Sequence, residues 1–224
     1  MENERLDWRG AELPEAVVLD GNWVRLEPLD AERHGAALWR AVQGADEVWD
    51  YLGDGPYATE AAFTEAIAGK AAGTAARFWA ILPEGSQEAA GYASLMRMDA
   101  ANGVIEVGNI LYSPGLQRTR AATEAMYLLA GYVFEALGYR RYEWKCNARN
   151  EPSRKAAARL GFQFEGIFRQ HMVIKGRNRD TAWYSIIDSE WPIIREVLKN
   201  WLAASNFDQH GQQIVRLEDL RTKC

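Results

Sequence analysis

Two polar segments of this chain hold residues whose types and spacing can do chemistry. The first is the turn at residues 117–122, QRTRAA, which follows a strand-like apolar run at 104–112 and a Ser-Pro-Gly break. A strand, a turn and a helix start leave backbone N–H groups unpaired, and such groups bind phosphate. The second segment, residues 150–162, opens with a helix-capping asparagine and closes on Gly-Phe. Taken alone, the turn also fits a solvated helix start that carries two surface arginines.

The hydrophobic pattern predicts the elements that must position these segments. Alternation of apolar and polar residues predicts strands at 23–29, 77–83, 90–98, 104–112 and 139–146, and a hairpin of 162–175 with 179–188. Helical spacing and capping residues predict helices at 31–42, 59–72, 119–136, 150–161 and 190–204. This order predicts an α+β fold around a central mixed sheet. We expect a loosely held arm at 1–20, one domain at 21–204 and a polar tail at 205–224.

Composition excludes several classes of protein. The 224 residues carry 26 Lys+Arg against 31 Asp+Glu, which gives a net charge of −5. A chain without a basic field is a poor candidate for binding nucleic acid or an anionic membrane. The polar N-terminus has no signal-peptide core, and no run reaches the ~18 apolar residues of a membrane span, so we expect a cytoplasmic protein. Cys146 and Cys224 lack the spacing of a zinc site, and no metal is expected.

The two polar segments resemble the cofactor motifs of the GCN5-related N-acetyltransferase (GNAT) superfamily. In that family the turn reads Gln/Arg-x-x-Gly-x-Gly/Ala. Here Gln117 and Ala122 fit its two ends, and Arg120 stands at the central glycine. Residues 123–125, TEA, and Ser153 are similar to the ribosomal-protein N-terminal acetyltransferase branch. The resemblance covers residues 20–190 and implies the GNAT fold: a mixed, mostly antiparallel sheet flanked by helices, here with an extra C-terminal helix.

The resemblance implies that acetyl-CoA is the co-substrate and that its pyrophosphate lies on the turn. The implied cofactor-binding residues are Ile110, Leu111, Tyr112, Gln117, Arg118, Thr119, Arg120, Ala121, Ala122, Thr123, Asn150 and Ser153. Arg118 or Arg120 would pair with a phosphate group. A backbone N–H near Leu111 would bind the thioester oxygen, because the family's sheet splays there.

Two residues, Glu106 and Ser153, are the candidates for proton transfer during catalysis. Many family members carry a tyrosine seven residues after the asparagine, but that position is Ala157 here. Ser153 is therefore the candidate donor to the departing thiolate, although a serine there also fits a helix cap. Glu106 is the lone acid of its strand and the candidate general base, acting directly or through water; His171 is the alternative base.

Two further features bear on the acceptor. Strand alternation places Glu106, Gly108 and Ile110 on one face and Val107, Asn109 and Leu111 on the other. Asn109 stands where relatives are often aromatic, and is a candidate for substrate selection. In the acidic loop at 46–58, the candidate substrate-binding residues are Trp49, Tyr51 and Tyr57, which would suit a cationic, partly apolar acceptor. A loop packed down by its own aromatic rings is the alternative.

These features predict an N-acetyltransferase that moves an acetyl group from acetyl-CoA to a primary amine by direct attack in a ternary complex. The branch implies a protein or peptide N-terminal α-amine as acceptor, and it admits a homodimer. Small-molecule amines such as antibiotics, polyamines and aminoacyl compounds are alternative acceptors, and a longer acyl group such as succinyl is an alternative donor. The alternative of another class is a non-catalytic acyl-CoA sensor, which Arg120 and Ala157 favour.

Overall fold

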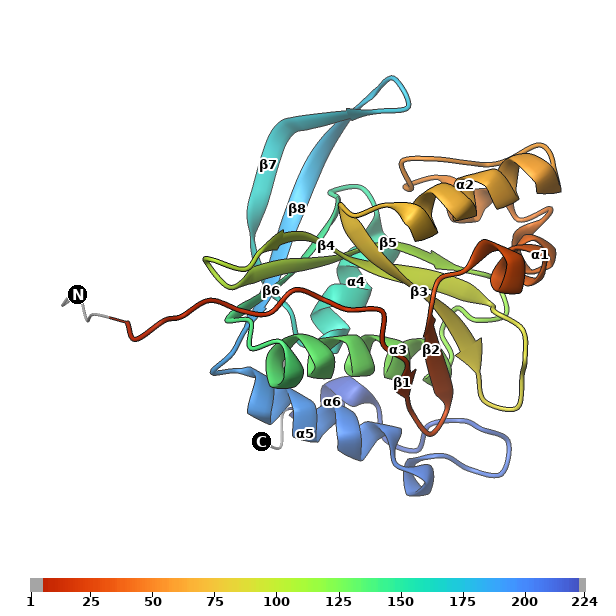
Figure 1. The fold of residues 1–224 in the computed structure, drawn as a ribbon. Coiled ribbons are helices and arrows are strands. Elements are labelled where there is room, and N and C mark those ends of the chain that lie inside the picture. The colour runs from red at the N-terminus through yellow and green to blue at the C-terminus, as the bar shows by residue number, and fades with distance from the viewer. Residues whose placement is uncertain (1–5, 222–224) are drawn as a thin grey trace.

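A single eight-stranded sheet forms the centre of the computed structural model, which describes residues 6–221 (Figure 1). Its strand order is β1-β2-β3-β4-β5-β6-β8-β7. Of the neighbouring pairs, β5 and β6 run parallel and the others antiparallel. The strands are β1 (Leu19–Asp20), β2 (Val24–Pro28), β3 (Ala76–Pro83), β4 (Gly91–Asp99), β5 (Val104–Tyr112), β6 (Arg141–Asn147), β7 (Gln163–Ile174) and β8 (Arg177–Ile187). The predicted α+β fold with a mixed, mostly antiparallel sheet is confirmed.

Helices cover both faces of the sheet (Figure 1). They are α1 (Ala31–Val42), α2 (Glu60–Ala72), α3 (Arg120–Gly131), α4 (Glu151–Leu160), α5 (Trp191–Leu202) and α6 (Leu217–Arg221), with short turns η1 (Asp46–Trp49), η2 (Tyr132–Ala136) and η3 (Ala204–Asn206). Leu129 of α3 and Trp201 of α5 belong to the larger hydrophobic cluster on one face. Leu38 of α1 and Phe63 of α2 belong to a second cluster on the other face. None of the helices among the described residues is long and apolar enough to cross a membrane.

Capping residues set the helix boundaries that the sequence predicted. Asp30 Oδ1 accepts a hydrogen bond from the Arg33 N–H at 2.8 Å and begins α1. Thr59 does the same for α2. Such a cap stabilises a helix by about 1 kcal/mol. The predicted helix at 119–136 is shorter than expected, because α3 ends at Gly131 and the chain continues as the π-helical turn η2.

Both ends of the described chain contact the domain, although we expected a loosely held arm at 1–20. The indole N–H of Trp8 donates to the Ala101 carbonyl at 2.6 Å. At the other end, Leu217 of α6 is fully buried, and the Arg221 guanidinium donates to the Ala158 carbonyl at 2.7 Å. Residues 1–5 and 222–224 of the predicted arm and tail, Cys224 among them, lie outside the described residues.

The hairpin of β7 and β8 rises away from the sheet, and its tip leans towards the α2 side of the molecule (Figure 1). Lys175, at the tip, donates from Nζ to the Trp49 carbonyl oxygen at 2.9 Å. This contact joins the hairpin to the loop at residues 46–58. The hairpin, that loop and the middle of the sheet therefore surround one region of the protein.

Candidate active site

An opening between β5 and β6 positions the candidate site. The parallel ladder between the two strands runs from Val104↔Arg141 to Val107↔Trp144 and ends there. Strand β5 continues to Tyr112 and β6 to Asn147, so their last residues have no ladder partner across the gap. Backbone groups that a sheet leaves unpaired are available to a ligand.

A β-bulge on β5 accompanies this opening. Ser94 of β4 pairs with Gly108 and Tyr92 pairs with Leu111, so β5 holds one extra residue between these pairs. Asn109 sits in the bulge with a φ of 49°, in the left-handed region that asparagine tolerates better than most residues. The Asn109 side-chain amide donates to the Ser94 hydroxyl at 3.0 Å and fixes it to β4.

The bulge overturns one expectation about β5. Simple alternation placed Val107 and Leu111 on the same face. In the structure Val107 packs in the cluster beneath α3 and α5, whereas Leu111 packs in the cluster beneath α1 and α2. The extra residue reverses the facing of every residue after it. Ile110 and Tyr112 therefore contact the α3 side, which is the side on which the turn at 117–122 lies.

The turn at residues 117–122 offers backbone donors to an anion. Thr119 caps α3, and its hydroxyl accepts from the Ala122 N–H at 3.1 Å. Among the described residues, the N–H groups of Arg118, Arg120 and Ala121 donate no hydrogen bond to the protein. Arg118 has a φ of 61°, which turns the backbone just before the helix. Three free donors at a helix N-terminus form a site that suits a phosphate group.

The side chains of the turn divide into exposed and packed ones. Gln117 and Arg118 are exposed. The Arg120 guanidinium instead lies between two aromatic rings, 3.5 Å from the centre of Trp23 and 3.7 Å from that of Phe207. Burial lowers the pKa of Arg120. Its backbone N–H, rather than its guanidinium, is therefore the group that is free for a ligand, and Arg118 is the arginine whose charge is available.

Two other contacts tie the start of α3 to its surroundings. The Tyr112 hydroxyl donates to the Ala122 carbonyl at 3.2 Å, which joins the end of β5 to the helix. The Thr123 hydroxyl lies 3.1 Å from a guanidinium nitrogen of Arg159, which joins α3 to α4. These bonds hold the two predicted cofactor segments in a fixed relation.

The second segment begins α4. Asn150 caps the helix, and its side-chain oxygen accepts from the Ser153 N–H at 3.1 Å. The Ser153 hydroxyl accepts from the Trp144 indole N–H at 3.0 Å, so its own proton is free to be donated. Burial raises the pKa of the neighbouring Cys146 thiol. The Ser153 hydroxyl can therefore donate its proton to an acceptor that lies next to the start of α4.

Glu106 lies on β5 just before the ladder to β6 ends, and it is buried. Its Oε2 lies 3.0 Å from Lys145 Nζ and 3.3 Å from Arg97 Nε. Burial raises the pKa of Glu106, and the two cations act in the opposite direction. A carboxylate with a raised pKa is a stronger base than an exposed one.

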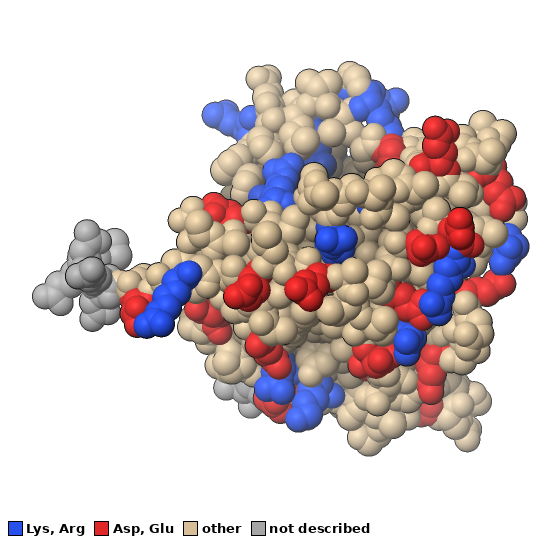
Figure 2. Space-filling model, viewed as in Figure 1, with Lys and Arg blue, Asp and Glu red and all other residues tan. Residues whose placement is uncertain are grey.

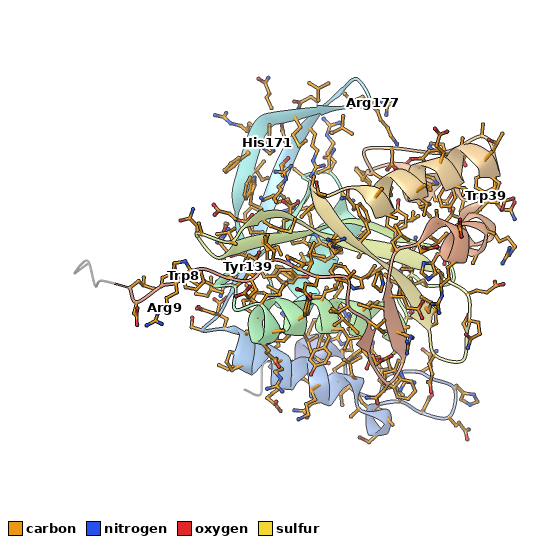
Figure 3. The ribbon with its side chains drawn as sticks, in the orientation of Figure 1. Trp8, Arg9, Trp39, Tyr139, His171 and Arg177 are labelled. Atoms are coloured by element: carbon orange, nitrogen blue, oxygen red, sulfur yellow. The ribbon has the colours of Figure 1, made fainter. Side chains whose placement is uncertain are left out.

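His171, the alternative base, stands on the β7–β8 hairpin (Figure 3). Its Nδ1 lies 3.0 Å from Thr181 Oγ1. Burial lowers the pKa of His171, and the nearby positive charges of Arg97, Arg179 and Lys145 act in the same direction. His171 therefore lies near Arg97 and Lys145, the two cations that pair with Glu106.

The aromatic residues of the loop at 46–58 differ in their burial and in their hydrogen-bond partners. Trp49 is buried and meets Tyr57 edge-to-face at 5.4 Å. The Tyr57 hydroxyl donates to Asp54 at 2.7 Å. Tyr51 is exposed, and its hydroxyl donates to the Arg149 carbonyl at 3.2 Å, beside the start of α4. Trp49 and Tyr57 thus pack the loop down, and Tyr51 links it to the cofactor segments.

The sequence reasoning missed three cations of this region: Arg97, Lys145 and Arg179. Tyr142, Trp144 and Cys146 of β6 belong to the core, so Lys145 must project from the opposite face. That alternation is visible in the sequence. The pairing of β6 with β5 and β8, which brings the cations next to Glu106, is not.

The fold and this site define the class of the protein as an acetyltransferase. The family model described as "Acetyltransferase (GNAT) domain" matches residues 24–163, and the chain belongs to this N-acetyltransferase family. Its structure is similar to that of a GCN5-related N-acetyltransferase from Brucella melitensis, with a TM-score of 0.94 and 48% identity over 96% of this chain and 99% of the other.

Two curated relatives match a smaller part of the chain. "Uncharacterized N-acetyltransferase p20" of Bacillus licheniformis is 34% identical over 53% of this chain and 66% of its own length. "Putative ribosomal N-acetyltransferase YdaF" of Bacillus subtilis is 31% identical over 45% of this chain and 55% of its own length. The matched region thus spans less than two thirds of either relative.

Proposed function

We propose that this N-acetyltransferase takes its acetyl group from acetyl-CoA and transfers it to a primary amine, the α-amine of a protein or peptide N-terminus. The observation that carries the proposal is the pairing of an anion-binding turn with a buried carboxylate across one opening in the sheet. The free N–H groups of Arg118, Arg120 and Ala121 would hold the pyrophosphate. Asn150 and Ser153 would border the pantetheine arm, and the open edge of Ile110–Tyr112 its thioester end.

In this proposal Glu106 is the general base. Acetyl-CoA supplies the carbonyl carbon that the amine attacks. An α-amine has a pKa near 8 and costs only about 1.4 kcal/mol to deprotonate at pH 7, whereas a lysine side chain costs about 4.6 kcal/mol. Glu106, which lies beside two cations, would accept the proton directly or through water.

Ser153 is the proposed donor to the leaving thiolate. Its hydroxyl accepts from Trp144, so its proton can point towards a sulfur. A thiol with a pKa near 8.5 leaves readily, and a neutral hydrogen-bond donor is sufficient to assist it.

The acceptor is inferred from the relatives and the loop. One curated relative bears a name that refers to ribosomal N-acetylation. The loop at 46–58 carries Asp46, Glu47 and Asp50 on its exposed surface, which would favour a cationic N-terminal segment. The proposal also assigns the activity to one domain at 21–204, places the protein in the cytoplasm, and includes a homodimer as an assembly that gel filtration can detect.

The first experiment measures thiol release from acetyl-CoA with a panel of N-terminal peptides, polyamines, aminoglycosides and amino acids. The proposal expects turnover with the peptides at a higher kcat/KM than with the other amines. Tight CoA binding without turnover on any amine would contradict it and favour the acyl-CoA sensor. Turnover on a small amine alone would retain the acetyltransferase and exclude the peptide acceptor.

A further inference from the structure

Most of the charged side chains around Glu106 form ion pairs with one another on one face of the sheet. Lys145 Nζ lies 3.0 Å from Glu106 and 2.6 Å from Glu143, and these three side chains are each less than a tenth exposed. Arg141 lies 2.7 Å from Glu143 and also pairs with Glu165. Glu106, Glu143 and Glu165 therefore each lie next to a positively charged side chain.

Arg179 is the cation of this region that has no carboxylate of its own. In the part of the chain that the structure describes, Arg179 forms no ion pair, and its Nε is buried without a hydrogen-bond partner. It lies near enough to Glu106 and Arg97 to interact with their charges, and burial lowers the pKa of Arg179. Arg179 is partly exposed, but a buried N–H without a hydrogen-bond partner is costly, and an incoming anion would relieve that cost.

A second donor lies on the same face of the same strand. Trp183 lies four residues after Arg179 on β8, so both side chains project from the same face. The Trp183 indole N–H is also buried without a hydrogen-bond partner among the described residues. Lys145 Nζ lies 3.8 Å from the centre of the Trp183 ring. The indole therefore lies beside the side chain that forms an ion pair with Glu106. Glu106 Oε2 is itself buried without a hydrogen bond of good geometry.

The surrounding charge favours an anion at this point. Arg97 and Lys145 also face the region, and Glu106 and Glu143 are already paired with Lys145. Figure 2 shows basic side chains on the projecting hairpin and acidic ones on the α2 side of the molecule. The hairpin side of the molecule thus carries the positive charge that an anion would meet (Figure 2).

We propose that Arg179, with the Trp183 N–H and Arg97, binds a carboxylate of the substrate beside the reacting amine. This inference rests on the proposed function and names a feature of its substrate. Guanidinium groups bind carboxylates through two parallel hydrogen bonds, and an indole N–H adds a third donor. Glu106 would hold the amine end, so the site is bipolar.

The carboxylate has two chemical sources. It belongs either to the acceptor, as an amino acid or a peptide with an acidic first residue, or to a dicarboxylic acyl group such as succinyl. In both cases the amine nitrogen bonds to the acyl carbon, the carbon–sulfur bond breaks, and the proton lost by the amine ends on the CoA thiol. The two sources differ only in which partner reaches Arg179.

The test compares each carboxylate substrate with a neutral counterpart. One arm offers acetyl-CoA with peptides that begin with Asp or with Asn; a second offers succinyl-CoA or acetyl-CoA with a neutral peptide. We expect the carboxylate to be favoured at least tenfold in kcat/KM in one arm. Arg179→Gln should abolish that preference, so that the ratio of kcat/KM for the charged and the neutral substrate falls to near one. Arg177→Gln, an exposed neighbour on the hairpin (Figure 3), is the matched control and should leave the preference intact.

A binding measurement separates this inference from the proposed function. Succinate is titrated into protein saturated with CoA, and we expect binding to wild type that Arg179→Gln weakens at least tenfold with CoA affinity and melting temperature unchanged. Succinate binding without turnover on any amine would retain the anion site and overturn the proposed function. Turnover with no carboxylate preference and no succinate binding would overturn the anion site alone, as would equal loss on charged and neutral substrates.

Discussion

At the turn of residues 117–122 the donors that face a ligand are backbone N–H groups, whereas beside Glu106 they are charged side chains. We call these the cofactor side and the acceptor side of the opening between β5 and β6. On the cofactor side, Arg120 occupies a motif glycine's place and its N–H is still free. On the acceptor side, buried charges from β5, β6 and β8 depend on one another. A site made of backbone N–H groups therefore tolerates changes of side chain that a site made of side chains does not.

The largest effect is expected from Glu106→Gln. It removes the proposed base and leaves Lys145 and Arg97 without this carboxylate. Loss of a general base lowers kcat by about 10² to 10⁴-fold. CoA affinity, which depends on the cofactor side, should remain within twofold. Steady-state kinetics and calorimetry measure the two quantities, and Glu88→Gln, which removes an exposed ion pair with Arg40, is the control.

The pH dependence of activity also tests the proposed role of Glu106 as the general base. Burial raises the folded-state pKa of Glu106, so the carboxylate form needed for a base is lost as the pH falls through this raised value. Activity should therefore decline on the acidic side at a higher pH than for an ordinary glutamate. Glu106→Gln should lack this decline. Because the folded form binds the proton more tightly, the group's contribution to stability is present at low pH and is lost as the pH rises through its folded pKa. A wild-type profile that Glu106→Gln leaves unchanged in shape would exclude Glu106 as the base.

A smaller effect, on the cofactor side, is expected from Arg120→Pro. Proline fits the first position of a helix, and the preceding Thr119 already has the extended backbone that proline requires. The substitution removes one N–H that would bind phosphate, so CoA affinity should fall by roughly tenfold. Arg120→Ala keeps the N–H and is the matched control. Equal affinities of the two variants in calorimetry would show that this N–H does not bind the cofactor.

The smallest effect is expected from Tyr51→Phe. It removes the hydrogen bond from an exposed hydroxyl to the Arg149 carbonyl and keeps the ring. A single neutral hydrogen bond contributes about 1 kcal/mol, so KM for the acceptor should rise up to about fivefold while kcat stays unchanged. Tyr57→Phe, which removes a hydroxyl bonded within the loop to Asp54, serves for comparison. A large fall in kcat would instead place Tyr51 among the reacting groups.

The same comparison explains what could be predicted from the sequence. Local signals were sufficient on the cofactor side: Asn150 caps the helix that it was expected to cap, and the predicted turn leads into α3. The acceptor side depends on the register between strands far apart in the chain. One extra residue at Asn109 reversed the facing that alternation predicted for β5, and no local pattern announces such a bulge. The position of Arg179 near Glu106 depends on two strand pairings at once, β5 with β6 and β6 with β8.

The packing of Arg120 between Trp23 and Phe207 also has a consequence for the history of this chain. Without those rings a long basic side chain at a motif glycine's place would lie free beside the phosphate groups. The aromatic pair holds it away, although the two rings come from opposite ends of the sequence and the arginine from its middle. They should therefore be inherited together: homologues with arginine here should keep both rings, and homologues with glycine should be free to vary them.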